Sequence, residues 1–163
     1  MDYARIVVAQ MNIADINPIV QAATNPNVFY TRSPLAALGY VRDREVDVAV
    51  VGQVFSRLNH DDPYWVSDGT KLAKNMEEVS PNLVVARYSF VPDEGDSCVF
   101  HADIPKRNAD IDKVVEFIDF DGLASLLKGR DTEEIMRRFP AFTWHKMNFN
   151  RNALHYQREF SLS

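Results

Sequence analysis

The stretch Val46-Asp47-Val48-Ala49-Val50-Val51-Gly52-Gln53-Val54-Phe55 decides the fold of this chain of 163 residues. It is a nearly continuous run of apolar, mostly β-branched residues, which is typical of a strand buried on both faces. Such strands belong to parallel sheets that are covered by helices. The end of a central parallel strand faces the crevice where open α/β folds bind ligands. Gly52 and Gln53 are predicted to hold that position, and neither can act as a nucleophile or a general base.

Shorter segments with strand or helix patterns alternate on both sides of this run. Apolar runs predict further strands at residues 5–10, 28–31, 83–90 and 114–118. Helices are predicted between and after these strands, because apolar residues recur there at helical spacing. The buried faces of these helices, in chain order, are formed by Ile16, Ile19, Val20 and Ala23; Leu35, Leu38 and Val41; Leu72, Met76 and Val79; Leu123, Leu126 and Leu127; and Ile135 and Phe139. No helix is predicted for residues 92–112.

The helix ends carry recognisable cap residues. Asn12 or Asp15 is expected to cap the first helix, in which Pro18 is tolerated only in the first turn. Ser33 and Pro34 begin the second helix as a cap and a first-position proline. Near the end of the chain, Asp119 or Asp121 is expected to cap a helix that ends at Gly129, and Asp131 opens a further short helix.

The alternation of strands and helices predicts an α/β fold. Such an order implies right-handed crossovers and a doubly wound parallel sheet. We expect a five-stranded domain in residues 1–130. Residues 131–163 are expected to form a C-terminal helix and an aromatic tail that docks on this domain or on a partner. One domain of this size agrees with the chain length, and 46% apolar residues suffice for a core.

Composition excludes several classes of function. The formal charge of −5 argues against a nucleic-acid partner. Cys98 is the single cysteine, so neither an intramolecular disulfide nor a cysteine zinc site is expected. The absence of a signal-peptide pattern and of a long apolar span predicts a cytoplasmic protein without membrane contact. We expect no cofactor and no metal, because His60-Asp61-Asp62 is typical of a solvated turn more than of a metal site.

Three short features accompany the predicted order of elements. Asp68-Gly69 precedes the third helix, Pro81 precedes the fourth strand, and Phe120-Asp121 leads into a helix near the end of the domain. With these features, roughly residues 4–128 resemble the receiver domain of bacterial response regulators. That family has a flavodoxin-like fold with sheet order 2-1-3-4-5. The resemblance implies a signalling protein whose phosphotransfer site lies at the carboxyl edge of the sheet.

The acidic residues of such a site are missing here. The family ends its first strand with two acidic residues that hold Mg²⁺, because a hard dication prefers carboxylate oxygens. This chain has Ala9 and Gln10 there, and Gly52 stands in the place of the phosphoacceptor aspartate. The resemblance therefore implies a pseudo-receiver, which is not phosphorylated and is not an enzyme.

Two further family residues are also expected to be replaced. The switch serine or threonine after the fourth strand falls on Ala86, and the lysine after the fifth strand falls on Ile118 or Asp119. Ser89 and Lys113 are more distant candidates for these two roles. The expected degenerate pocket consists of Ala9, Gln10, Gly52, Ala86 and Ile118.

Other polar residues offer weaker signals. Gln53 and Arg87 are candidates for contact with a ligand or an anion in the crevice, although Arg87 could instead be a surface arginine paired with Asp68 or Asp93. His101, His145 and His155 have no partner at a diagnostic spacing, and surface or core roles are favoured for them over catalysis.

The C-terminal tail combines aromatic and basic residues. Its candidate interface residues are Phe142, Trp144, Phe149, Tyr156 and Phe160. The favoured hypothesis is a regulatory module that binds a protein partner or a second copy of itself as a homodimer. The alternatives are a small flavodoxin-like enzyme or ligand-binding protein that uses the loop at 56–67 and the carboxyl edge, and a structural subunit whose tail completes a larger assembly.

Overall fold

The computed structural model describes residues 3–52, 69–89, 99–106 and 110–145. These ranges do not include Gln53, the loop at residues 56–67 or the tail residues Phe149, Tyr156 and Phe160.

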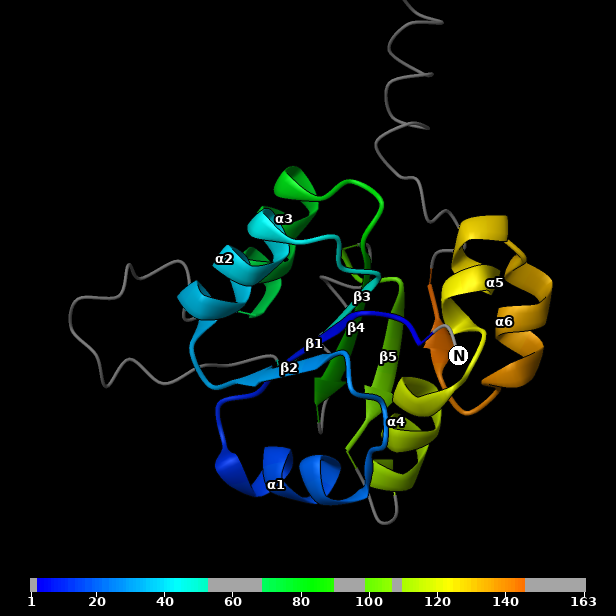
Figure 1. Cartoon of the computed structure of the whole chain (residues 1–163), viewed down its shortest axis with the longest axis horizontal. Coiled ribbons are helices and arrows are strands. Elements are labelled where there is room, and N and C mark those ends of the chain that lie inside the picture. The colour runs from blue at the N-terminus through cyan, green and yellow to red at the C-terminus, as the bar shows by residue number, and fades with distance from the viewer. Residues whose placement is uncertain (1–2, 53–68, 90–98, 107–109, 146–163) are drawn as a thin grey trace, which may run out of the picture.

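Within the described ranges, one sheet of six strands forms the centre of the molecule (Figure 1). Its order is β2-β1-β3-β4-β5-β6, and the first five of these strands run parallel. The strands are β1 (Ile6–Ala9), β2 (Val28–Thr31), β3 (Val48–Val51), β4 (Val84–Ser89), β5 (Ala102–Pro105) and β6 (Thr143–Trp144). The α/β class and the order 2-1-3-4-5 are confirmed, and β6 adds an antiparallel strand beside β5.

β3 lies at the centre of this sheet, between β1 and β4. Its four residues are fully buried, as the β-branched run predicts. Val48 and Val50 belong to the apolar cluster on one face of the sheet, and Ala49 and Val51 belong to the cluster on the other face. The alternating direction of side chains along a strand thus supplies both halves of the core.

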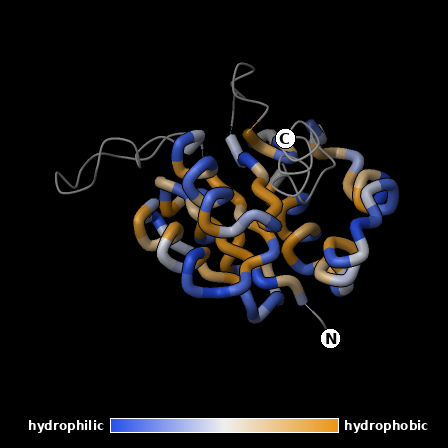
Figure 2. The backbone as a smooth tube through the Cα atoms, turned by 90° about the horizontal axis from the view of Figure 1, so that it is seen from above, coloured by the Kyte–Doolittle hydropathy of each residue, from blue (hydrophilic) through white to orange (hydrophobic). Residues whose placement is uncertain are grey.

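Helices cover both faces of the sheet. α2 (Pro34–Asp43) and α3 (Gly69–Val79) lie over one face, while α1 (Ile13–Ala22) and α4 (Asp110–Asp119) lie over the other (Figure 1). α5 (Leu123–Gly129) and α6 (Thr132–Arg138) follow at the end of the sheet that carries β5 and β6. Segments rich in hydrophobic residues gather between these layers, and segments rich in hydrophilic residues lie outside (Figure 2).

The predicted fifth strand is wrong. Residues 114–118 lie inside α4, and β5 is formed by residues 102–105, where no element had been predicted. The burial of Val114, Phe117 and Ile118 follows helical spacing, whereas Glu116 between them is exposed. A short apolar run fits a strand and a buried helix equally well, so its position against the sheet decides between them.

Several helix details also differ from expectation. Val20, Leu35 and Val79 are between 40% and 46% exposed rather than buried. Pro18 lies beyond the first turn of α1, where it cannot donate the hydrogen bond that continues the helix. Gly122, with φ 115°, precedes α5 in place of an aspartate cap, a backbone conformation that favours glycine.

Asn12, Ser33 and Asp131 cap their helices as predicted. Each side chain accepts a hydrogen bond from a backbone N–H in the first turn of the helix, at 3.0 to 3.2 Å. Asp119 has a different role, because its carboxylate accepts hydrogen bonds from the backbone N–H groups of Thr24 and Asn25. It thereby ties the end of α4 to the loop before β2.

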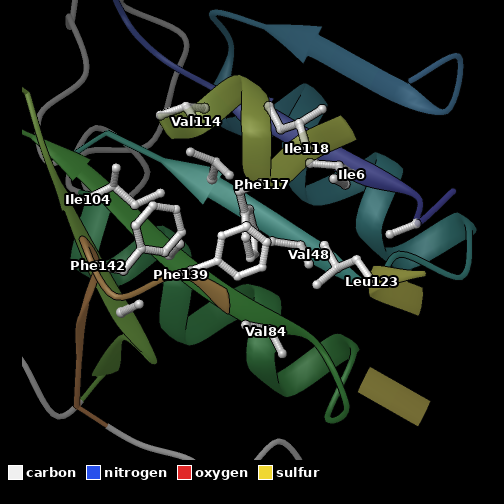
Figure 3. Close-up of a cluster of buried hydrophobic side chains, with 14 of the residues drawn as sticks. Ile6, Val48, Val84, Ile104, Val114, Phe117, Ile118, Leu123, Phe139 and Phe142 are labelled. Carbon is white, nitrogen blue, oxygen red and sulfur yellow. The ribbon is translucent and has the colours of Figure 1, made fainter. Parts of the chain in front are cut away.

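Residues 131–145 pack into the core of the domain (Figure 3). Ile135, Phe139 and Phe142 are at most 5% exposed, and the rings of Phe139 and Phe142 lie 4.8 and 5.1 Å from that of Phe117. Trp144 is partly buried beside them and donates to the carbonyl of Phe139. Phe142 is therefore a buried core residue of the folded domain and is not part of its exposed surface.

Candidate functional site

The carboxyl ends of four parallel strands meet at one edge of the sheet. β1 is followed by Gln10, β3 by Gly52 and β5 by Lys106, while β4 ends at Ser89. Pairing of Ala9 with Val51 places Gln10 beside Gly52, and pairing of Ser89 with Pro105 places Lys106 one residue further along. These four residues define the carboxyl-edge site.

Gln10 occupies the space over Gly52. A β carbon added to Gly52 would lie 3.3 Å from the Gln10 side-chain oxygen, so the amide fills the room that a larger residue at 52 would need. The Gln10 side chain is fully buried, and neither its oxygen nor its nitrogen has a hydrogen-bond partner among the described residues. A buried amide in this state is neutral and has no nucleophilic character.

An ion pair joins the two sides of this edge. The Lys106 Nζ lies 2.8 Å from an Asp15 carboxylate oxygen, and the two side chains are 12% and 24% exposed. Lys106 follows β5, whereas Asp15 lies in the first turn of α1, on the far side of β3 and β4 in the sheet order. Lys106 also lies over the ring of Tyr88, with the ammonium 5.0 Å from the ring centre.

Ser89 ends β4 with a buried hydroxyl. Its side-chain oxygen has no hydrogen-bond partner among the described residues, and its carbonyl accepts from the backbone N–H of Lys106 at 2.9 Å. Ser89 and Lys106 therefore stand at the ends of adjacent strands, which are the places that the receiver resemblance gives to its serine or threonine and its lysine.

The predicted places of these two residues require correction. Ile118 and Asp119 are not at a strand end, because they belong to α4, and Lys113 lies in the same helix. Ala86 is an interior residue of β4, which continues to Ser89. Both errors follow from the misplaced fifth strand and from the extent of the fourth. The sequence signal that could have identified Lys106 is its position directly after Ala102-Asp103-Ile104-Pro105. This segment is too short and too polar to be recognised as a strand.

Arg87 lies in β4 and does not line the edge. It is completely buried, and its guanidinium binds the Asp103 carboxylate of β5 through Nε at 2.5 Å and a terminal nitrogen at 3.0 Å. The ring of Phe100 lies 4.5 Å from the guanidinium carbon. Arg87 is therefore not the surface arginine that the sequence allowed, and its predicted partners Asp68 and Asp93 lie outside the described residues.

His145 contacts this buried pair from the surface, with its side chain 23% exposed. Its Nε2 lies 2.5 Å from the second Asp103 oxygen, and its backbone N–H donates to the carbonyl of His101 at 2.8 Å. His101 is buried, and its Nδ1 accepts from the backbone N–H of Val85. These contacts give both histidines structural roles that hold β4, β5 and the end of β6 together.

The described residues contain no group of three histidine, cysteine, aspartate or glutamate side chains arranged to hold a metal ion. No helix within the described ranges is long and apolar enough to cross a membrane. A cavity of about 250 Å³ opens at the opposite edge of the sheet, where Asp47, Asn82, Leu127, Lys128 and Arg130 line it. It shares no residue with the carboxyl-edge site.

Comparison with known proteins places the fold. No protein-family model matches the sequence, and no curated protein matches it. A signal receiver domain of an HD-domain protein from Pseudomonas fluorescens aligns with a TM-score of 0.58 at 14% identity, over 83% of this chain and 94% of that one. A CheY-like receiver domain from Methanospirillum hungatei gives the same score and identity, over 81% and 99%.

A third structure comes from a protein with a different description. The structure described as an adenylate cyclase from Rhodopirellula baltica aligns with a TM-score of 0.55 at 15% identity, over 83% of this chain and 98% of that one. At these identities the likeness concerns the fold. The chain has the receiver, CheY-like α/β fold, and β6 adds an antiparallel strand beside β5.

Proposed function

We propose that this protein is a regulatory module of receiver type that does not accept phosphoryl groups and acts by binding another protein. The observation that carries the proposal is the buried Gln10 amide, which lies over Gly52 at the end of β3. A receiver needs a carboxylate at this place to take up phosphate.

The charges at the carboxyl edge support the same conclusion. Asp15 is the acidic residue that the described part of the edge offers, and its carboxylate is bound by Lys106 at 2.8 Å. Mg²⁺ prefers several carboxylate or water oxygens in an octahedral arrangement. Gln10 supplies no charge, and the ammonium of Lys106 opposes a dication. Both requirements for phosphotransfer, a nucleophile and a metal ligand set, are thus unmet by the described residues.

The proposed partner surface differs from the one that the receiver resemblance implies. Receivers commonly associate through the fourth and fifth strands and the last helix of the domain. In this chain β6 pairs with β5 along that side, and α6 packs its Ile135 and Phe139 into the same core. A partner therefore meets α5, α6 and the residues that follow Trp144. Phe149, Tyr156 and Phe160 remain the proposed contact residues of the tail.

Intact-mass measurement tests the proposal directly. Wild-type protein incubated with acetyl phosphate and Mg²⁺ should show no phosphoryl adduct, because position 52 carries no carboxylate. Gly52→Asp alone should also remain unmodified. An adduct of stoichiometric amount on the wild-type chain would overturn the assignment.

A designed variant provides the positive control. Gly52→Asp combined with Ala9→Asp and Gln10→Asp supplies the acidic residues, while Ser89 and Lys106 already stand at the neighbouring strand ends. Magnesium-dependent labelling of this triple variant would show that the assay detects a competent site in the same scaffold. Copurification from the native cells, compared for the full chain and for a chain ending at His145, would then test the partner surface.

A further inference from the structure

The last described part of the chain is joined to the domain by a very short hinge. α5 ends at Gly129 and α6 begins at Thr132, so that Arg130 and Asp131 alone connect them. Arg130 has φ 55° and ψ 39°. It is the one non-glycine residue with a positive φ among those the structure describes. The left-handed conformation disfavours an ordinary side chain by about five- to thirtyfold per residue.

Beyond this hinge, residues 131–145 form a unit that we name the C-terminal arm. The arm inserts Ile135, Phe139 and Phe142 into the core and adds β6 to the sheet. It ends with the contact between His145 and the Asp103 carboxylate. All these contacts join the arm to the body of the domain, so they would form equally well if the arm came from a second copy.

A straightened hinge would carry the arm away from its own body. With Arg130 in a helical conformation, α5 and α6 would merge into one helix from Leu123 to Arg138. The merged helix gives up the cap of α6, in which the Asp131 side chain accepts from the backbone N–H of Glu134. The merged helix removes the unfavourable backbone conformation of Arg130, and the displaced arm leaves a core that must be covered again.

We propose that two copies of this chain exchange their C-terminal arms and form a symmetric dimer. Each arm then completes the sheet and the core of the other copy, and the two new contacts are identical by symmetry. Short, strained hinges favour such exchange because the dimer keeps the contacts of the monomer and loses the strain. The proposal is independent of phosphotransfer, since it involves no residue of the carboxyl-edge site.

Light scattering of the full chain tests the exchange. The protein should be refolded at several concentrations from about 1 to 500 μM, because an arm must leave its body before it can change copies, and reducing agent should be present to prevent disulfides through Cys98. The dimer fraction should rise with the refolding concentration. A chain that stays monomeric throughout, also as Asp131→Ala, would overturn the proposal.

Two hinge variants should shift the dimer in opposite directions. Arg130→Gly relieves the closed hinge and weakens a continuous helix, so its dimer dissociation constant should rise at least tenfold. Asp131→Ala removes the side chain that caps α6 only in the closed arrangement, so it should lower the constant by about fivefold or more. Lys128→Gly is the matched control, because Lys128 is helical in both arrangements and its loss changes stability without changing the dimer.

The directions in which the hinge variants change the dimer dissociation constant distinguish arm exchange from association through an unrelated surface. A dimer whose dissociation constant is the same for Arg130→Gly, Asp131→Ala and the wild type forms through an unrelated surface and contradicts the exchange. Circular dichroism of each variant should show a folded protein, so that loss of dimer in Arg130→Gly is not mistaken for unfolding. In Arg130→Ala the left-handed conformation of residue 130 is again unfavourable, so the dimer lost in Arg130→Gly should return.

Discussion

Lys106 and Asp15 form an ion pair that links the end of β5 to the first turn of α1 across the carboxyl edge. The two residues are 91 positions apart in the chain, and the side chains that meet are mostly buried. The contact therefore fixes the position of α1 relative to the far half of the sheet.

This pair should contribute measurable stability. In a double-mutant cycle of Lys106→Met and Asp15→Asn, we expect a coupling free energy of about 1 kcal/mol in urea unfolding, since the pair is partly shielded from water. The exposed Arg42–Asp43 pair, with side chains 62% and 67% exposed, is the matched control and should give a coupling near zero. Equal coupling in the two cycles would mean that the Lys106–Asp15 contact does not persist in solution.

Replacing Gln10 with an apolar residue should stabilise the protein. The buried amide has no described hydrogen-bond partner, and a buried polar group in that state costs about 1–3 kcal/mol. Gln10→Met keeps most of the volume and should raise the free energy of unfolding by about 1 kcal/mol. The measurement is urea unfolding at pH 7, and a loss of more than 1 kcal/mol would show that the amide is satisfied.

Breaking the Arg87–Asp103 pair should be costly. Arg87→Met leaves the Asp103 carboxylate buried with only His145 as a partner among the described side chains that contact it, and we expect a loss of about 3–5 kcal/mol. The double variant Arg87→Met with Asp103→Leu should lose less than either single variant, because no isolated charge remains. Thermal unfolding of the three variants gives this order, and an additive double variant would contradict it.

Stability above pH 10 should depend on Tyr30. Burial raises the pKa of its phenol above the ordinary 10.0, and the negative Asp119 raises it further. The unfolded chain therefore releases this proton at a lower pH than the folded chain. The contribution of Tyr30 is fully present below about pH 10 and is lost as the pH rises through the folded-state pKa.

The test compares wild type with Tyr30→Phe in unfolding experiments from pH 8 to about pH 11. The difference in unfolding free energy between the two proteins should be constant below about pH 9, and the wild type should lose stability more steeply above pH 10. If the unfolding free energies of the two proteins decline in parallel throughout this range, Tyr30 is not the cause of the loss of stability.

The parts of the fold that follow local patterns were predictable. The β-branched run at Val48–Val51 gave the central strand, and the cap residues Asn12 and Ser33 gave the starts of two helices. Each of these signals lies within a few residues of the element that it predicts, so distant contacts were not needed to recognise it.

β5 could not be recognised in the same way. Its Asp103 is buried, which no local pattern predicts, because the compensating charge is Arg87, 16 positions earlier, and the third partner is His145, 42 positions later. With β5 missed, the apolar residues of α4 were taken for the last strand, and Lys106 was not connected with the edge of the sheet. The site was thus half predicted: Gln10 and Gly52 were placed correctly at strand ends, while Lys106 was missed and Ser89 was only a distant candidate.

β6 has a consequence for the behaviour of the protein in concentrated solution. An open strand edge offers unpaired N–H and C=O groups on which other chains can polymerise, and natural sheets limit this hazard with short or covered edges. Here Thr143 and Trp144 pair with Asp103 and Ala102 of β5, so that this side of the sheet ends in a strand of two residues rather than four. β6, the shortest of the described strands, therefore limits the growth of fibrils from this side of the sheet.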